Sequence, residues 1–225
     1  MSRKNKKEKN KKTQKSGGRF YRICYAALSG IVGCCMRIHV VNPEAEPDTE
    51  SFLVCSNHIG ATDPIILSYA FRCHQVRFMA KKELFKIPVL AQLIRMFGAF
   101  PVDRGGTDVG AIRHAISLLQ EKKCMGIFPQ GHRYPGVEPR TTSTKNGAAM
   151  ICLKAQADVV PMYIYRKNRT PKLFRKTYVI FGERIPYAEL EKLCEGTGDY
   201  ARVSAKIFDD VCTLGERLEK EVAGS

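Results

Sequence analysis

Short apolar runs alternate with amphipathic stretches along most of the chain. The runs are rich in β-branched and aromatic residues, which is typical of strands. They are FLVCS from Phe52, VRFMA from Val76, AFPV from Ala99, MGIFP from Met125, VVPMYIY from Val159 and TYVIF from Thr177. Helical patterns follow each of the first four runs, and two more follow the last. This alternation predicts an α/β fold with a mixed, largely parallel sheet flanked by helices.

Two of the predicted helices show an apolar stripe at helical spacing. Residues on one face of a helix recur every three or four positions, and such faces pack against the core. The stripes are Val109, Ile112, Ile116 and Leu119, and then Val203, Ile207, Val211, Leu214 and Leu218. We expect both stripes to be buried, and His114, on the opposite side of the first helix, to be exposed.

Length and charge divide the chain into a single domain and an N-terminal extension. With 225 residues, 44% of them hydrophobic, one core is expected. The net charge is +15, and residues 1–19 hold nine Lys or Arg against one acid, Glu8. We predict that 1–19 is a disordered polybasic tail drawn to anionic surfaces, that 42–51 is a linker, and that 52–225 is the folded domain.

Residues 20–41 contain the uncharged run Ile23–Met36, which is bracketed by arginines. It is shorter than the ~20 residues that span a bilayer, and we interpret it as a helical segment in the membrane interface. A buried core helix would fit the same pattern. So would a secretory signal, since IVGC ending at Cys34 resembles a lipoprotein cleavage site. The basic residues before it predict a peripheral or monotopic protein on the cytoplasmic face of the cell membrane.

Several kinds of site are not indicated. The nine cysteines form no C-x-x-C pair, and Cys55, Cys124, Cys152 and Cys212 lie in apolar stretches, as buried reduced thiols of a cytosolic protein would. No Cys/His grouping has the spacing of metal ligands, so no metal is expected. The chain has no P-loop and no nucleic-acid-binding signature, so no specific nucleic acid is expected as a partner.

The segment Ser56–Pro64, SNHIGATDP, places His58 and Asp63 between a predicted strand and a predicted helix. Asp before Pro is a typical helix start, so Asp63 could simply be the N-cap. However, α/β sheets bind their ligands where a strand ends and a helix begins. A five-residue loop can also bring His58 within hydrogen-bond reach of Asp63. A carboxylate that holds one ring nitrogen leaves the other as a general base.

Four segments in order resemble the blocks of the glycerolipid acyltransferases, the 1-acylglycerol-3-phosphate acyltransferase family. SNHIGATDP resembles its N-H-x-x-x-x-D block. The second to fourth blocks are similar to GAFPVDR from Gly98, FPQGHR from Phe128 and VVPM from Val159, and FMAKKELFKIPVL resembles the connecting segment. The resemblance covers roughly residues 20–182.

The resemblance implies transfer of an acyl chain from a thioester of coenzyme A or acyl carrier protein to the sn-2 hydroxyl of a lysophospholipid at a membrane, without a cofactor. His58 would be the base and Asp63 would orient it. The arginines of the second and third blocks, Arg104 and Arg133, would bind phosphate. The other residues expected to contact substrate are Asn57, Lys81, Lys82, Asp103, Gln130, Gly131 and His132.

The third block departs from the family's usual F-P-E-G-T-R. Gln130 stands where the family has Glu, and His132 where it has Thr. A role that needs a carboxylate at Gln130 is therefore in doubt, and we expect the consequence to be in acceptor specificity. Two alternatives stay open: an acyltransferase for another lysolipid head group, and an inactive membrane-bound scaffold of the same family.

Overall fold

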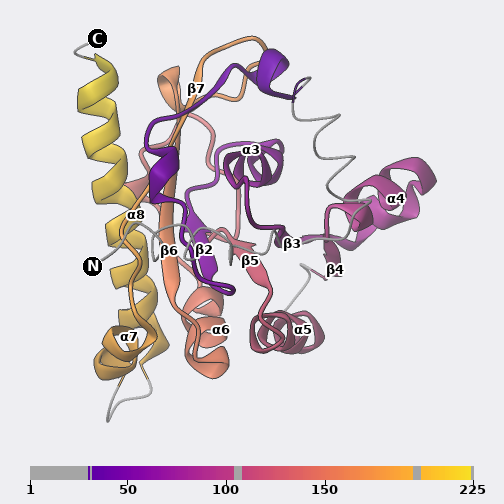
Figure 1. Ribbon diagram of the computed structural model, residues 1–225, viewed down its shortest axis with the longest axis vertical. Helices are drawn as coiled ribbons and strands as arrows, with labels where there is room; N and C mark the ends of the chain where they lie inside the picture. Colours follow the sequence, from indigo (N-terminus) through magenta and orange to yellow (C-terminus); the bar gives the residue numbers. More distant parts are fainter. Residues whose placement is uncertain (1–29, 31, 104–107, 195–198, 224–225) are drawn as a thin grey trace, which may run out of the picture.

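A twisted sheet with helices on both faces forms the body of the molecule (Figure 1). The computed structural model describes residues 30, 32–103, 108–194 and 199–223. The strands are β1 (Ile38–Val40), β2 (Leu53–Ser56), β3 (Val76–Lys81), β4 (Phe100–Val102), β5 (Cys124–Ile127), β6 (Val159–Arg166) and β7 (Thr177–Phe181). Their order across the sheet is β1-β7-β6-β2-β5-β3-β4. Among the seven strands of the described residues only β6 and β7 pair antiparallel, so the prediction of an α/β fold with a largely parallel sheet is confirmed.

Helices cover both faces of the sheet, and alternate residues of the strands face each layer. In β2, Leu53 and Cys55 pack with the helices of one layer, whereas the side chain of Val54 packs with α3 and the N-terminal part of the chain. The helices are α3 (Asp63–Ala70), α4 (Pro88–Met96), α5 (Val109–Gln120), α6 (Gly147–Ala155), α7 (Tyr187–Cys194) and α8 (Tyr200–Ala223). The short 3-10 turns are η1 (Pro43–Ala45), η2 (Lys82–Lys86), η3 (Pro139–Thr141) and η4 (Lys167–Arg169).

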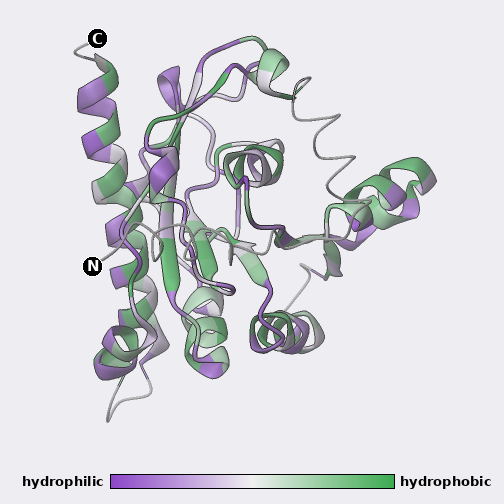
Figure 2. Ribbon diagram, in the orientation of Figure 1, coloured by the Kyte–Doolittle hydropathy of each residue, from purple (hydrophilic) through white to green (hydrophobic). Residues whose placement is uncertain are grey.

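Helix α8 follows its predicted stripe, and α5 departs from its own. Figure 2 shows hydrophobic and hydrophilic residues in alternation along α8, as expected for a helix with one buried face. Four of the five predicted residues of α8 are fully buried, and Leu214 packs at the edge of the same core. In α5 Leu119 is buried as predicted, and Ile112 and Ile116 are partly buried against the same core, but the other buried residues are Ala111, Ala115 and Leu118. Val109 is 53% exposed, so the prediction that it is buried is wrong.

The reason for the shift in α5 lies in its small residues. Two alanines let the helix approach the sheet closely, and they rotate the buried face away from Val109, which is the first residue of the helix. Side chains at helix ends extend beyond the packed layer. His114 is exposed as predicted, although the edge of its ring packs on Phe100 at a centroid distance of 4.6 Å.

The predicted interfacial segment is only partly described. Residues 32–36 are helical, but residues 38–40 form strand β1, which pairs with β7, so the helical prediction is wrong for these three residues. The predicted polybasic tail 1–19 lies outside the described residues. Within the described part of the chain, no helix combines the length and the apolar character needed to cross a bilayer.

Residues 42–51, interpreted from sequence as a linker, are bonded to the domain through Glu46. Its carboxylate accepts hydrogen bonds from the backbone N–H groups of Arg72 and Cys73 and contacts His74 Nδ1, each at 2.9 Å. Burial raises the pKa of Glu46, but these contacts outweigh it and hold the pKa below the ordinary value. The segment is therefore fixed to the loop after α3.

Candidate active site

The site lies where neighbouring strands β2 and β5 send the chain to opposite faces of the sheet. After β2 the chain continues into α3, which packs on one face, and after β5 it continues toward α6 on the other. Such a divergence leaves a crevice at the carboxyl ends of the strands, where α/β sheets bind ligands. The loop from β2 carries His58, and the loop from β5 carries Gln130 and His132.

His58 and Asp63 meet as predicted. The distance from His58 Nδ1 to Asp63 Oδ2 is 2.8 Å, and both side chains are nearly inaccessible. The same carboxylate oxygen accepts hydrogen bonds at 2.7 Å from the backbone N–H groups of Ile59 and Gly60. Three donors on one oxygen stabilise the ionised carboxylate and close the loop between histidine and aspartate. With Nδ1–H donated to Asp63, His58 Nε2 keeps its lone pair.

Asp63 does not cap the helix in the way that its position before Pro64 predicts. It is the first residue of α3, Thr62 occupies the N-cap position, and that residue makes no side-chain cap hydrogen bond. The carboxylate turns back toward the loop because His58 and two backbone N–H groups offer it stronger partners than the helix end does. The N-cap prediction for Asp63 is therefore wrong, and the prediction that it holds His58 is geometrically satisfied.

The imidazole of His58 is also fixed by stacking. Its ring centroid lies 4.1 Å from that of Phe128, and the two planes are inclined by 14°. The backbone carbonyl of His58 accepts a hydrogen bond at 2.9 Å from Tyr134 N–H, beyond the same loop. The first and third sequence blocks are thus joined around the histidine, which leaves little freedom for the ring.

A cleft of about 600 Å³ begins at His58. Its walls are mainly apolar: Phe78, Met79, Val102, Ile112, Ile127, Phe128, Met150 and Ile151. Its polar lining is Asp103, Asp108, His132, Lys145 and Asn146. The cleft is large enough for a small organic ligand, and the apolar wall suits a hydrocarbon chain.

Two residues predicted to contact substrate are instead enclosed by protein. Asn57 is fully buried, and its amide both donates to and accepts from the backbone of Ile164 in β6, at 3.0 and 2.8 Å. Gln130 is 1% exposed. Its Oε1 accepts from His58 N–H and its Nε2 donates to Thr142 Oγ1, both at 2.7 Å. Substrate contact is at odds with this burial, and both amides hold the segment that carries His58.

The other predicted residues are exposed or lie outside the described part of the chain. Gly131, His132 and Asp103 line the cleft, and the first two are exposed together with Arg133. Lys81 and Lys82 are about half exposed, and they pair with Glu83 and Asp103 respectively. The hydrogen bond from Lys82 to Asp103 is the main cause that raises the pKa of Lys82. Arg104 lies outside the described residues, so its role stays a prediction.

Sequence reasoning missed Arg166 and Lys145. Arg166 ends the buried strand β6, is 3% exposed, and donates to Thr177 Oγ1 and Thr62 Oγ1 at 3.0 and 3.2 Å. Burial lowers the pKa of its guanidinium, and the charge of Asp63 opposes that shift. In the sequence, the available signal for Arg166 is a single cation at the end of an apolar run. Lys145 lines the cleft just before α6, and only the fold brings it there.

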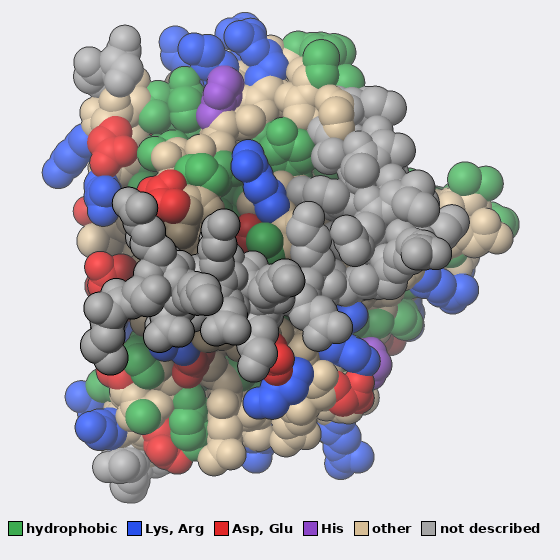
Figure 3. All heavy atoms as spheres, in the orientation of Figure 1, with side chains coloured by type: hydrophobic (Ala, Val, Ile, Leu, Met, Phe, Trp, Pro, Cys, Tyr) green, Lys and Arg blue, Asp and Glu red, His purple; other side chains and the backbone are tan. Residues whose placement is uncertain are grey.

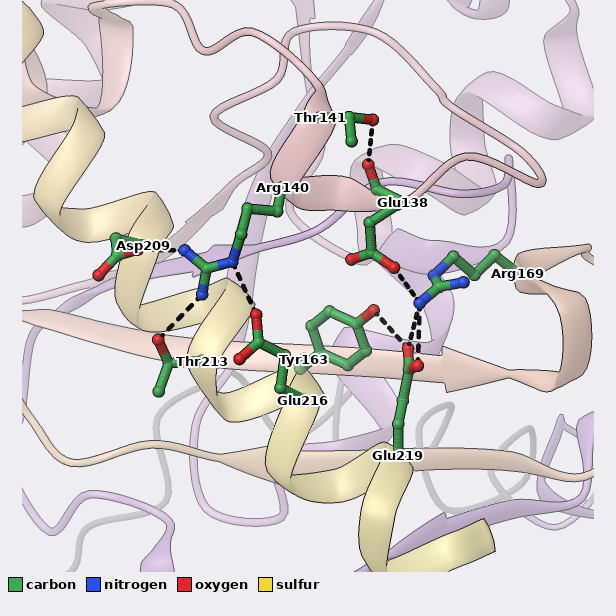
Figure 4. A network of polar contacts seen from close by, with 9 residues as sticks. All are labelled: Glu138, Arg140, Thr141, Tyr163, Arg169, Asp209, Thr213, Glu216 and Glu219. Atoms are coloured by element: carbon green, nitrogen blue, oxygen red, sulfur yellow. Dashed lines mark hydrogen bonds and ion pairs between the residues drawn. The ribbon is translucent and has the colours of Figure 1, made fainter.

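Helix α8 braces the loop that follows Gln130. Figure 4 shows Arg140, in η3, pointing toward Asp209, Thr213 and Glu216 of α8, and the distance from Arg140 Nε to Glu216 Oε1 is 2.7 Å. Glu219 accepts a hydrogen bond from Arg169 at 2.9 Å. An isolated exposed ion pair contributes little to stability, but a network of such pairs fixes the loop after Gln130 relative to α8.

Comparisons with known proteins agree with this fold and site. The acyltransferase family model matches residues 37–165. The chain is 32% identical to the 1-acyl-sn-glycerol-3-phosphate acyltransferase of Bacillus subtilis over 77% of this chain and 86% of that protein. It is 31% identical to the protein of the same name from Streptococcus pneumoniae, over 76% of this chain and 66% of that one.

A solved structure is similar over nearly the whole chain. It is the crystal structure of the 1-acyl-sn-glycerophosphate acyltransferase PlsC from Thermotoga maritima. The TM-score is 0.67, the identity is 23%, and the match covers 97% of this chain and 84% of that one. At this identity the likeness supports the fold.

Proposed function

Because the chain belongs to the 1-acyl-sn-glycerol-3-phosphate acyltransferase family, we propose that it moves a fatty acyl chain from an acyl thioester to the sn-2 hydroxyl of 1-acylglycerol-3-phosphate. The product is phosphatidic acid, a precursor in phospholipid biosynthesis. The observation that carries the proposal is the 2.8 Å contact between Asp63 and His58, which lines a mainly apolar cleft. A base beside a hydrocarbon-binding wall is what acylation of a lipid hydroxyl requires.

In the proposed reaction His58 Nε2 takes the proton of the acceptor hydroxyl as its oxygen attacks the thioester carbonyl. Asp63 stabilises the imidazolium that forms. The tetrahedral intermediate then expels the thiolate, which takes the proton back from His58, so that the products are an ester and a free thiol. The steps need no covalent acyl-enzyme and no cofactor. Coenzyme A and acyl carrier protein are both possible donors.

We assign the acyl chain to the apolar wall of the cleft and the acceptor phosphate to the cations at its mouth. Arg133 and His132 follow Gln130 on an exposed loop, and Lys81 and Lys82 lie at the end of β3. Arg104 completes the set by sequence resemblance. Charge-assisted contacts from several cations suit a phosphate dianion. His132 favours a second candidate, an acceptor with another head group, because the family generally has Thr there.

The proposed place of action is the cytoplasmic face of a membrane, where acyl thioesters are found. The basic N-terminal residues and the uncharged run Ile23–Met36 support this placement, since a polybasic segment and an interfacial helix together anchor a protein stably.

The test is transfer of a labelled acyl group from coenzyme A or acyl carrier protein to a panel of lysolipids. We expect 1-acylglycerol-3-phosphate to be acylated, and His58→Ala to lower the rate by about 10²- to 10⁴-fold. Asp63→Asn should also be severely impaired. His114→Ala is the matched control, because this exposed histidine lies outside the cleft. Absence of product from every member of the panel would favour the inactive scaffold.

A further inference from the structure

The loop between β6 and β7 exposes two large apolar side chains. Leu173 and Phe174 are 62% and 63% exposed, whereas most large hydrophobic side chains of the described residues are buried or partly buried. Three exposed cations surround the pair in the sequence, Lys172, Arg175 and Lys176. The core does not need either apolar side chain, so the loop leaves exposed to water an apolar surface that could have been buried on folding.

The backbone of this loop is fixed. Phe174 has φ +60°, which is unfavourable for a bulky aromatic residue. Its N–H donates to Cys35 O at 2.7 Å, and Thr177 N–H donates to Arg37 O at 3.1 Å. The loop therefore lies beside helical residues 32–36, where the uncharged run Ile23–Met36 ends.

The other end of the loop touches the catalytic loop. A Cβ placed on Gly60 would lie 2.8 Å from Cβ of Pro171, so the ring of Pro171 packs closely against the backbone of Gly60. Gly60 is two residues from His58 and donates a hydrogen bond to Asp63. A surface that binds Leu173 and Phe174 would therefore lie next to His58 and Asp63.

The geometry points to a lipid bilayer as that surface: we propose that residues 171–176 insert Leu173 and Phe174 into the interface of an anionic membrane. Two apolar side chains among three cations combine hydrocarbon burial with attraction to anionic head groups. Figure 3 shows Lys and Arg side chains beside hydrophobic ones along the upper edge of the molecule, where Figure 1 places the loop that leads into β7. The loop would present the acceptor lipid to His58, which rests on the function proposed above.

The first experiment measures binding of the full chain to phosphatidylcholine vesicles with and without phosphatidylglycerol. Leu173→Ser/Phe174→Ser should weaken partitioning by roughly tenfold to a hundredfold, and the loss should persist at high salt. Replacing the three cations by Gln should weaken only the binding that depends on phosphatidylglycerol. Val109→Ser is the matched control, because Val109 is also half exposed but lies on α5.

The second experiment uses the absence of Trp from the chain. Phe174→Trp places a single indole in the loop, and Val109→Trp places one on α5. With vesicles, the first should show blue-shifted emission and quenching by lipids brominated on their acyl chains, and the second should show neither. If the loop indole is unaffected while the protein is bound to vesicles, the proposal is wrong, whatever the N-terminal residues contribute to binding.

Activity assays separate this proposal from the proposed function. The Leu173→Ser/Phe174→Ser variant should lose turnover of acceptor in vesicles but keep that of a dispersed short-chain acceptor. If wild-type protein acylates no acceptor, the proposed function fails while the fluorescence result still decides the membrane contact. If the variant binds vesicles normally and loses turnover only with acyl carrier protein thioesters, the loop serves the donor protein and the lipid proposal is overturned.

Discussion

Replacement of Gln130 by Leu tests whether this residue positions His58 or binds substrate. Leu fills a similar volume but offers no hydrogen bond. The side chain of Gln130 is 1% exposed, and its Oε1 accepts from the backbone N–H of His58 at 2.7 Å. Without that acceptor, a buried N–H beside the catalytic ring is left unpaired.

The cost follows from the two hydrogen bonds of the amide. An unsatisfied buried donor costs about 1–3 kcal/mol. The second bond adds less, because Thr142 Oγ1 keeps its own hydrogen bond to Pro139 O at 2.6 Å. We therefore expect Gln130→Leu to lower the free energy of unfolding by about 1–3 kcal/mol. A displaced His58 should lower kcat roughly tenfold to a hundredfold, since misplacement by about 1 Å has such effects.

Denaturant unfolding and steady-state kinetics measure the two effects, with Gln120→Leu as the control at an exposed position. Gln130→Glu keeps an acceptor for His58 N–H, so it should lower kcat less than Leu does. A positioning role leaves the KM for the acceptor nearly unchanged. Normal stability combined with a raised KM for the lysolipid would refute the reasoning and return Gln130 to the substrate site.

Three further predictions concern other parts of the molecule. Glu46→Gln should destabilise the protein near neutral pH. The pKa of Glu46 is lowered in the folded state, so the difference in unfolding free energy between variant and wild type should persist above the ordinary pKa of 4.5. It should shrink as the pH falls below that value. Denaturation at several pH values measures this difference. Burial raises the pKa of the Cys124 and Cys152 thiols to about 12, so neither should be alkylated by iodoacetamide at pH 8 unless the protein is unfolded, which peptide mass spectrometry would detect. A Cβ on Gly126 would lie 2.2 Å from Phe78 in the cleft wall, so Gly126→Ala should destabilise by about 1–3 kcal/mol and impair long acyl donors more than short ones in a chain-length assay.

The hydrophobic periodicity of the sequence was sufficient to predict the layers of the fold, but not the strand at the edge of the sheet, β1. The central strands are buried on both faces and therefore read as continuous apolar runs, as in Val159–Arg166. Strand β1 has three residues and follows an apolar run, so its pattern merges with that of a helix. It forms because β7 offers a partner, and such long-range pairing leaves no local signal.

The contact between His58 and Asp63 was predictable because six consecutive residues of the sequence define it. The supports around it were not, because they come from distant parts of the chain. Asn57 bonds to Ile164, which is 107 residues away, and Gln130 bonds to the backbone of His58 across 72 residues. A polar residue in a motif reads as a ligand contact when only the sequence is visible. Once the strands are paired, burial shows which of these residues face the protein.

The two departures of the third block have different consequences, because the loop turns between them. Gly131 has φ +70°, and a Cβ there would lie 3.0 Å from Lys145 Cγ, so glycine is required at the turn. The turn sends Gln130 into the protein and leaves His132 exposed at the cleft. Glutamine in place of glutamate therefore keeps an acceptor for His58 N–H without burying a charge. His132 and Arg133 are exposed on the far side of the turn, so we propose that specificity for the acceptor head group depends on them.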